Sequence, residues 1–138
     1  MQFGGQKMQQ EKEKSHKLTD KEFFAKIQKI EYPKYDLDYT HTFKKSVKAS
    51  YKSNKDLQQL LTAIEILVKT GNLPSEYNLH PLTGFPQKKN EKVMECHIAS
   101  DWLLVWLQNN AVLTMMLFDT GSHSDLFYSK NLRKGILK

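Results

Sequence analysis

The sequence predicts an α+β domain in which helices pack on one face of a small twisted antiparallel sheet. Apolar side chains recur at helical spacing within residues 20–70, and three strand-like segments follow within residues 92–118. Helices followed by a run of strands are typical of α+β proteins, whereas parallel α/β proteins alternate the two. The length of 138 residues suits one domain with terminal appendages.

The first 34 residues are predicted to be an N-terminal extension of this domain. Residues 1–17 are rich in Gln, Lys and Glu, a composition that favours disorder. A capping-box pattern runs from Thr19 to Glu22, and apolar residues follow at helical spacing. We therefore expect a short amphipathic helix over residues 20–31, ended before Pro33. This helix either packs on the domain or belongs to an interaction segment or an added extension.

A strand and two helices are predicted next. Residues 35–40 alternate as a strand does, and residues 41–52 carry apolar side chains at every fourth position. Ser53 or Asn54 is expected to cap a second helix that ends at Gly71. The apolar stripe of that helix is Leu57, Leu60, Leu61, Ile64, Leu67 and Val68.

Residues 72–90 are predicted to form a long loop, and loops of this length are often functional. Strands are expected at about 92–98, 102–108 and 111–118. The turn between the last two is placed at Asn109-Asn110. The second and third strands are apolar on both faces, which favours central positions in the sheet.

The first of these strands alternates between an apolar and a polar face. Its apolar residues should meet the helices, and its polar residues, Glu95 and His97, should line an open face. Because neighbours on a strand point in opposite directions, Cys96 is expected to be a small buried residue rather than the partner of His97 in a catalytic dyad. The predicted core includes Leu57, Leu60, Leu61, Ile64, Cys96 and Ile98.

The net charge of +6 lies in the tails. Residues 1–34 carry 8 Lys against 5 acids, and residues 128–138 carry 3 Lys and 1 Arg without an acid. Residues 35–127 carry 9 Lys against 10 acids, a charge of −1. The global charge is therefore a poor argument for nucleic-acid binding, and local patches must supply it.

Several protein classes are excluded or disfavoured by composition. No stretch of about 18 apolar residues is present, so no membrane span is predicted. The N-terminus lacks the apolar segment of a secretory signal. A single Cys cannot form an internal disulfide, which fits a reducing compartment, and we expect a cytoplasmic protein.

Three motifs occur in order: HPLTG from His80, ECHIASDWLLVW from Glu95 and GSHSDLF from Gly121. Together they resemble the YafQ-type branch of the RelE/ParE superfamily of small bacterial toxins, most of which are ribosome-dependent mRNA endoribonucleases. The resemblance spans about residues 35–127 and implies a RelE-like fold with two helices on the sheet, here with an extra N-terminal helix. Residues 128–138 then form a basic C-terminal tail.

The resemblance also implies a catalytic site made of His80, His97, Asp101, His123 and Phe127. Imidazoles transfer protons near neutral pH, and an aromatic ring can stack on a base. His123 is expected to move a proton during RNA cleavage, with Phe127 beside the RNA. From the residues alone, His123 can instead be an exposed loop residue or a partner of Asp125, and the ring of Phe127 can lie under the sheet.

The other candidates also have simpler interpretations. If Ser100 starts a tight turn, Asp101 can orient His97. Otherwise Asp101 is an ordinary turn residue and His97 faces solvent. His80 matches a site histidine of the YafQ-type toxins, but Pro81 can also place it in an ordinary loop. These histidines and Asp101 resemble a zinc set, yet none shows the spacing of known metal motifs. We expect no metal and no cofactor.

Four residues are candidates for RNA binding. Lys88, Lys89 and Lys92 precede a strand of the sheet and can hold phosphates, although runs of this kind are commonly solvated. Trp102 joins them from the resemblance, although its position favours packing against the sheet.

Asp119 departs from the pattern of the resembling family. YafQ-type toxins usually carry an Arg two residues before the Gly of the last motif, where it would hold the scissile phosphate. A carboxylate there would repel phosphate, and loss of one charge-stabilising donor can cost on the order of 100- to 1000-fold in rate. Arg133, the only Arg, lies in the tail. The sequence therefore predicts weakened catalysis.

The function implied is the toxin of a type II toxin–antitoxin pair that cleaves mRNA on the ribosome. Its partners would be a cognate antitoxin, ribosome-bound mRNA and, through the antitoxin alone, operator DNA. The alternative is a weakened toxin that serves as an antitoxin-binding module and transcriptional co-repressor. Inhibition of DNA gyrase, as in the ParE branch, is disfavoured because that branch needs no histidine site.

Overall fold

A computed structural model describes residues 17–85 and 88–127 of the chain. Of the segment 1–17 that was expected to be disordered, residues 1–16 lie outside the described residues, as does the basic tail at 128–138. The helices are α2 (Asp20–Gln28), α3 (His41–Lys52), α4 (Leu57–Thr70) and α5 (His123–Phe127), with a 3₁₀ turn η1 (Ser75–Tyr77). The strands are β1 (Asp36–Tyr39), β2 (His80–Pro81), β3 (Glu91–Ala99), β4 (Trp102–Asn109) and β5 (Thr114–Gly121).

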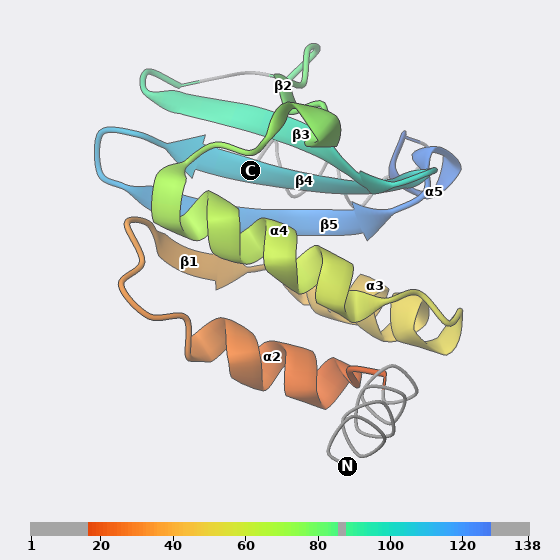
Figure 1. Ribbon diagram of the computed structural model, residues 1–138. Helices are drawn as coiled ribbons and strands as arrows, with labels where there is room; N and C mark the ends of the chain where they lie inside the picture. Colours follow the sequence, from red (N-terminus) through yellow and green to blue (C-terminus); the bar gives the residue numbers. More distant parts are fainter. Residues whose placement is uncertain (1–16, 86–87, 128–138) are drawn as a thin grey trace.

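The five strands form one sheet in the order β1-β5-β4-β3-β2, and α4 crosses one face of it (Figure 1). Strands β2 to β5 pair antiparallel, which confirms the predicted α+β class. The edge strand β1 departs from the purely antiparallel prediction because it pairs in parallel with β5. Two helices lie between β1 and the rest of the sheet in the sequence, and such a long crossover is what a parallel pair requires.

The N-terminal helix α2 packs on the domain. The predicted capping box is present, since Thr19 Oγ1 accepts from the Glu22 backbone and Glu22 Oε1 accepts from the Thr19 backbone. Phe23 and Ile27 are buried in the core shared with α3 and α4. The helix ends at Gln28, three residues before the predicted end.

Helices α3 and α4 follow the predicted bounds, but the cap of α4 differs. Ser53 closes α3, and Asn54 takes a positive φ of 63° in the turn. Asp56 therefore caps α4, accepting from the Gln58 backbone N–H. At the other end Gly71 is left-handed with φ 79°, as a helix-terminating glycine commonly is.

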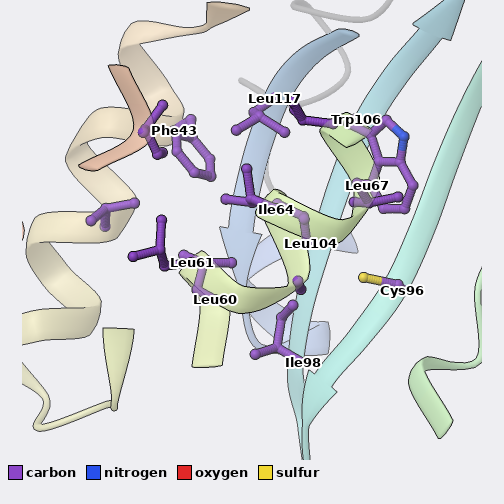
Figure 2. Packing of buried hydrophobic residues seen from close by; sticks show 14 of the residues in the cluster. Phe43, Leu60, Leu61, Ile64, Leu67, Cys96, Ile98, Leu104, Trp106 and Leu117 are labelled. Carbon is purple, nitrogen blue, oxygen red and sulfur yellow. The ribbon is translucent and has the colours of Figure 1, made fainter. Parts of the chain in front are cut away.

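The main core lies between the helices and one face of the sheet (Figure 2). Burial confirms the predicted core residues: all six are at most 9% exposed. Figure 2 shows Cys96 and Ile98 of β3 beside Leu104 of β4 and facing the α4 side chains. Each of these buried aliphatic side chains contributes about 1.5–3 kcal/mol to folding.

The opposite face of the sheet is covered rather than open near its centre. A second apolar cluster occupies it, contributed by β3, β4, β5, the segment after β2 and the short helix α5: Leu82, Val93, Leu103, Val105, Phe118 and Leu126. Glu95 on this face is only 3% exposed, so the predicted open polar face is wrong for that residue. His97, two residues on, lies nearer the edge and is half-buried.

Strand β5 begins three residues later than predicted. Asn109 pairs with Thr114, so the turn holds four residues instead of two. The side chain of Asn109 explains this, because its Oδ1 accepts from the backbone N–H groups of Ala111 and Val112 and stabilises the wider turn. The shift carries Asp119 into the strand.

A buried polar network lies at the turn end of the sheet. Gln108 Nε2 donates to Gly71 O and Tyr35 Oη, both at 3.2 Å, and Gln108 Oε1 accepts from Trp106 Nε1 at 2.9 Å. Tyr35 Oη donates to Asn110 Oδ1 at 2.6 Å. These bonds tie the end of α4 to β4 and to the entry of β1. Within the described residues, no helix has the length and apolarity needed to cross a membrane.

Candidate active site

Three histidines form a row on the sheet face opposite α4. The ring of His97 lies between the other two, 6.3 Å from His80 and 5.7 Å from His123, centroid to centroid. They come from β3, β2 and the start of α5, which are distant in sequence. The structure thus brings together three of the side chains that the sequence analysis expected at one site.

Asp101 holds His123 in position. The β3–β4 turn gives Asp101 a positive φ of 51°, which Asp tolerates better than most residues. Its Oδ1 accepts from the His123 backbone N–H at 3.0 Å and lies 2.9 Å from His123 Nδ1. These two hydrogen bonds, the backbone one first, lower the pKa of Asp101. Asp101 therefore remains a carboxylate well into the acid range and directs the imidazole.

The predicted pairing of Asp101 with His97 is thus wrong. Asp101 contacts His123, which is 22 residues away in sequence. A tight turn does form at Ser100, as that prediction required, but it aims the carboxylate across the end of β4 toward α5. Asp101 lies only four residues from His97 in sequence, but this closeness did not reveal that its partner is His123.

His80 is held by a backbone carbonyl and by Glu95. Its Nδ1 lies 2.8 Å from Asn78 O, and its Nε2 lies 3.0 Å from Glu95 Oε1. A carbonyl only accepts, so Nδ1 must carry a proton there. The second contact is a hydrogen bond only if a further proton lies between Nε2 and the carboxyl oxygen. These two contacts fix the orientation of the His80 ring beside His97.

Glu95 is a site residue that the sequence analysis missed. Its other oxygen, Oε2, is buried and lacks a hydrogen-bond partner among the described residues. A buried acceptor left unpaired costs about 1–3 kcal/mol, so it offers a position where a bound group can donate. The sequence did hold a signal for this residue. Side chains two positions apart on a strand lie on the same face, so Glu95 shares its face with His97.

His80 lies in a strand rather than in the predicted loop. It pairs with Glu95 in the two-residue strand β2, and Pro81 pairs with Met94. The strand pairing explains why the ring reaches the neighbouring carboxylate. The HPLTG motif thus positions His80 through backbone hydrogen bonding to β3.

Trp102 does not form an RNA-stacking surface. It is 2% exposed, and its Nε1 donates to Thr120 Oγ1 at 3.0 Å. Thr120 in turn donates to the carbonyl of Leu103. The expectation that Trp102 packs against the sheet is confirmed, and its assignment to RNA binding is wrong. Its bond to β5 helps fix the strand end that precedes His123.

The three predicted RNA-binding lysines lie away from the histidines. Lys88 and Lys89 are exposed before β3, and Lys92 lies near the start of that strand. Five residues separate Lys92 from His97, roughly 16 Å along a strand. An odd separation also places the two side chains on opposite faces. The structure therefore does not bring this lysine cluster to the site.

Two further predicted positions are resolved differently. The side chain of Phe127 lies outside the described part of the structure, so its place at the site stays a prediction. Cys96 faces the main core, away from His97, as expected. Burial raises the pKa of Cys96 to about 12, which excludes a reactive thiolate near neutral pH.

Asp119 is 4% exposed near the end of β5. Its Oδ1 accepts hydrogen bonds from Ser46 Oγ of α3 and from the Thr120 backbone N–H. Burial raises the pKa of Asp119, although the Ser46 hydrogen bond opposes this. In the described residues, no group of three or more His, Cys, Asp or Glu side chains is arranged to hold a metal ion.

Comparisons with known proteins agree with this architecture. The family described as "Bacterial toxin of type II toxin-antitoxin system, YafQ" matches residues 35–128. The mRNA interferase toxin YafQ of Escherichia coli strain B / BL21-DE3 is 31% identical over 93 residues, which is 67% of this chain and 95% of that protein.

Solved structures show the same fold. The E. coli DinJ-YafQ toxin-antitoxin complex contains a chain with a TM-score of 0.60 and 28% identity, covering 68% of this chain and 98% of that one. The archaeal RelE-RelB complex from Pyrococcus horikoshii OT3 gives 0.52 at 13% identity, covering 64% and 94%, a likeness of fold alone. The predicted RelE-like fold is thereby confirmed.

Proposed function

The chain belongs to the YafQ family of type II toxin–antitoxin toxins, and on this premise we propose that it is an endoribonuclease that cleaves mRNA on the ribosome. The observation that carries the proposal is the row of three imidazoles, with His123 anchored by Asp101 and His80 by Glu95. Such a set can both remove and donate protons around one phosphodiester.

The proposed reaction uses the ribose 2′-OH of the substrate as nucleophile. His97 takes the 2′-OH proton as the oxygen attacks the adjacent phosphorus. The bond from phosphorus to the 5′-oxygen breaks, and His123 in its imidazolium form protonates that oxygen. The products are a 2′,3′-cyclic phosphate and a 5′-OH, and no cofactor is required because the nucleophile is internal to the RNA.

The contacts of each histidine support these roles. The Asp101 carboxylate faces His123 Nδ1, so the proton to be transferred belongs to Nε2. His80, held by Asn78 O and Glu95 Oε1, lies next to His97, so the imidazoles can surround one phosphodiester.

The proposed partners follow from the family. A cognate antitoxin would neutralise the toxin, as the DinJ-YafQ and RelE-RelB complexes illustrate for their own chains. The other proposed partners are ribosome-bound mRNA and, through the antitoxin alone, operator DNA.

The direct test is single-turnover incubation of the purified chain with programmed ribosomes. We expect cleavage within the ribosome-bound codon, with a cyclic or 3′-phosphate on one fragment and a 5′-OH on the other. Cleavage of free mRNA at the same rate would contradict ribosome dependence. A 5′-phosphate product would contradict attack by the 2′-OH.

A second candidate is a weakened toxin that acts as an antitoxin-binding module and co-repressor. The identity of residue 119 favours it, because a carboxylate stands where the resembling family usually carries a phosphate-binding Arg. Absence of cleavage together with tight antitoxin binding would support this candidate over the nuclease.

Replacing Asp119 with Arg separates the two. We expect Asp119→Arg to raise single-turnover cleavage by about tenfold or more, because a carboxylate gives way to a phosphate-binding guanidinium. Asp119 lines the groove but is 4% exposed, so the longer side chain must give up the Ser46 contact to extend into the groove. Asp119→Asn, which removes the charge and keeps the size, should give a smaller increase. Equal or lower cleavage by Asp119→Arg, with an unchanged Tm, would show that Asp119 has a role of its own.

A further inference from the structure

A groove of about 690 Å³ lies between α3 and the end of β5, and it reaches Asp125 of α5, the short helix that begins at His123. Pockets of this size are typical of small-molecule and nucleotide sites. Its wall on one side is α3 and the α3–α4 turn, and on the other the last residues of β5 with Asp125 of α5. The cationic side chains along it are Lys45, Lys55 and His41 when protonated.

Lys55 stands out among these because the structure fixes its position. Its backbone N–H donates to Ser50 O at the end of α3, and the next residue, Asp56, caps α4. Its side chain is half-buried, with Nζ 5.4 Å from the centre of the Trp102 ring. Lys55 also contributes to lowering the pKa of Asp101, the carboxylate that holds His123.

We propose that this groove is a phosphate-binding subsite for the RNA strand next to the scissile bond, with Lys55 as its cation. The inference rests on the proposed function and identifies a positive group that the predicted cluster of Lys88, Lys89 and Lys92 does not provide at the histidines. In this proposal the RNA strand runs from His123 past Gly121 and Asp125, both of which line the groove. Its next phosphate then meets the Lys55 ammonium group.

The acidic residues of the groove leave room for an anion on the Lys55 side. Asp119 Oδ1 is engaged by Ser46 and by the Thr120 backbone. Asp125 Oδ2 accepts from the Ser122 backbone at 3.3 Å. Lys55, by contrast, faces the Trp102 ring, whose π surface attracts a cation without neutralising its charge.

The experiment measures both binding and cleavage. Fluorescence anisotropy follows binding of a short single-stranded RNA that carries a 2′-deoxy residue at one position and therefore cannot be cleaved there. Lys55→Gln should weaken binding by about 10- to 100-fold, as loss of a charged hydrogen bond does. It should also reduce the slope of log K against log salt by about 0.7, the value for one phosphate of a single strand.

Lys52→Gln is the matched control, because Lys52 is an exposed lysine three residues away that does not line the groove. It should leave affinity and cleavage within about twofold of wild type, as exposed solvated lysines usually do. Lys55→Arg should retain most of the binding, since it keeps the charge. Equal Tm values for all variants exclude unfolding as the cause.

The outcomes distinguish this inference from the proposed nuclease. If the wild type cleaves mRNA and Lys55→Gln binds and cleaves like Lys52→Gln, the subsite is wrong and the nuclease stands. If the wild type does not cleave but Lys55→Gln selectively loses RNA binding, the subsite stands and the nuclease fails. Absence of RNA binding by the wild type would overturn the subsite.

Discussion

His123→Ala is expected to reduce single-turnover cleavage of ribosome-bound mRNA by about 100- to 10,000-fold, the range for loss of a general acid. The imidazole is the proposed donor to the 5′-oxygen, which leaves poorly as an alkoxide. Its ring is oriented by the carboxylate of Asp101 at 2.9 Å, so the group is positioned before the substrate arrives. The measurement is the rate constant for cleavage at saturating enzyme.

Two variants control for this result. Ser124→Ala changes the next exposed residue and should leave the rate close to that of wild type. Asp101→Asn should lower the rate less than His123→Ala, because it removes the carboxylate but keeps the imidazole. All three should melt within a few degrees of wild type, since the side chains of His123 and Asp101 are 50% and 63% exposed. Full activity of His123→Ala would remove the nuclease assignment that depends on it.

Gly71→Ala is expected to lower the free energy of unfolding by about 2–4 kcal/mol. Two costs add up: the strain of an alanine in the left-handed backbone conformation and the loss of a hydrogen bond of the Tyr35 hydroxyl. Gly71 has a φ of 79°, where a side chain is strained, and a Cβ there would lie 2.5 Å from Tyr35 Oη. That hydroxyl bridges Gln108 and Asn110 in the buried network, so it cannot move without breaking those bonds. Urea denaturation measures the change.

Gly84→Ala separates backbone strain from the contact. Gly84 also has a positive φ, of 89°, but a Cβ there would have nothing within 4 Å. It should therefore cost only the strain of the left-handed backbone, about 1–2 kcal/mol. If the two variants lost equal stability, the close approach to Tyr35 would carry no energetic weight.

Features set by local chemistry were predictable from the sequence. The capping box at Thr19, the end of α4 at Gly71 and the apolar stripe of α4 each depend on residues within one or two turns, and the structure confirms all three. The start of β5 was misplaced because a single side chain, Asn109, widened the turn.

Features set by distant segments were not predictable in the same way. The parallel edge pair, the burial of Glu95 and the contact of Asp101 with His123 each join parts of the chain that lie far apart in sequence. Period and composition carry no information on such partners. The family motifs indicated which histidines would lie together, but not which carboxylate contacts each one.

The parallel edge pair links folding to activity. Strand β1 has β5 as its neighbour in the sheet, and Asp36 pairs with Thr114 across a large sequence separation. Contacts of that kind form late, because closing a long loop costs entropy before the contact repays it. The same β5 leads directly into His123. A chain in which β5 has not yet docked therefore lacks both the β1–β5 pair and the contact between Asp101 and His123, on which the proposed activity depends.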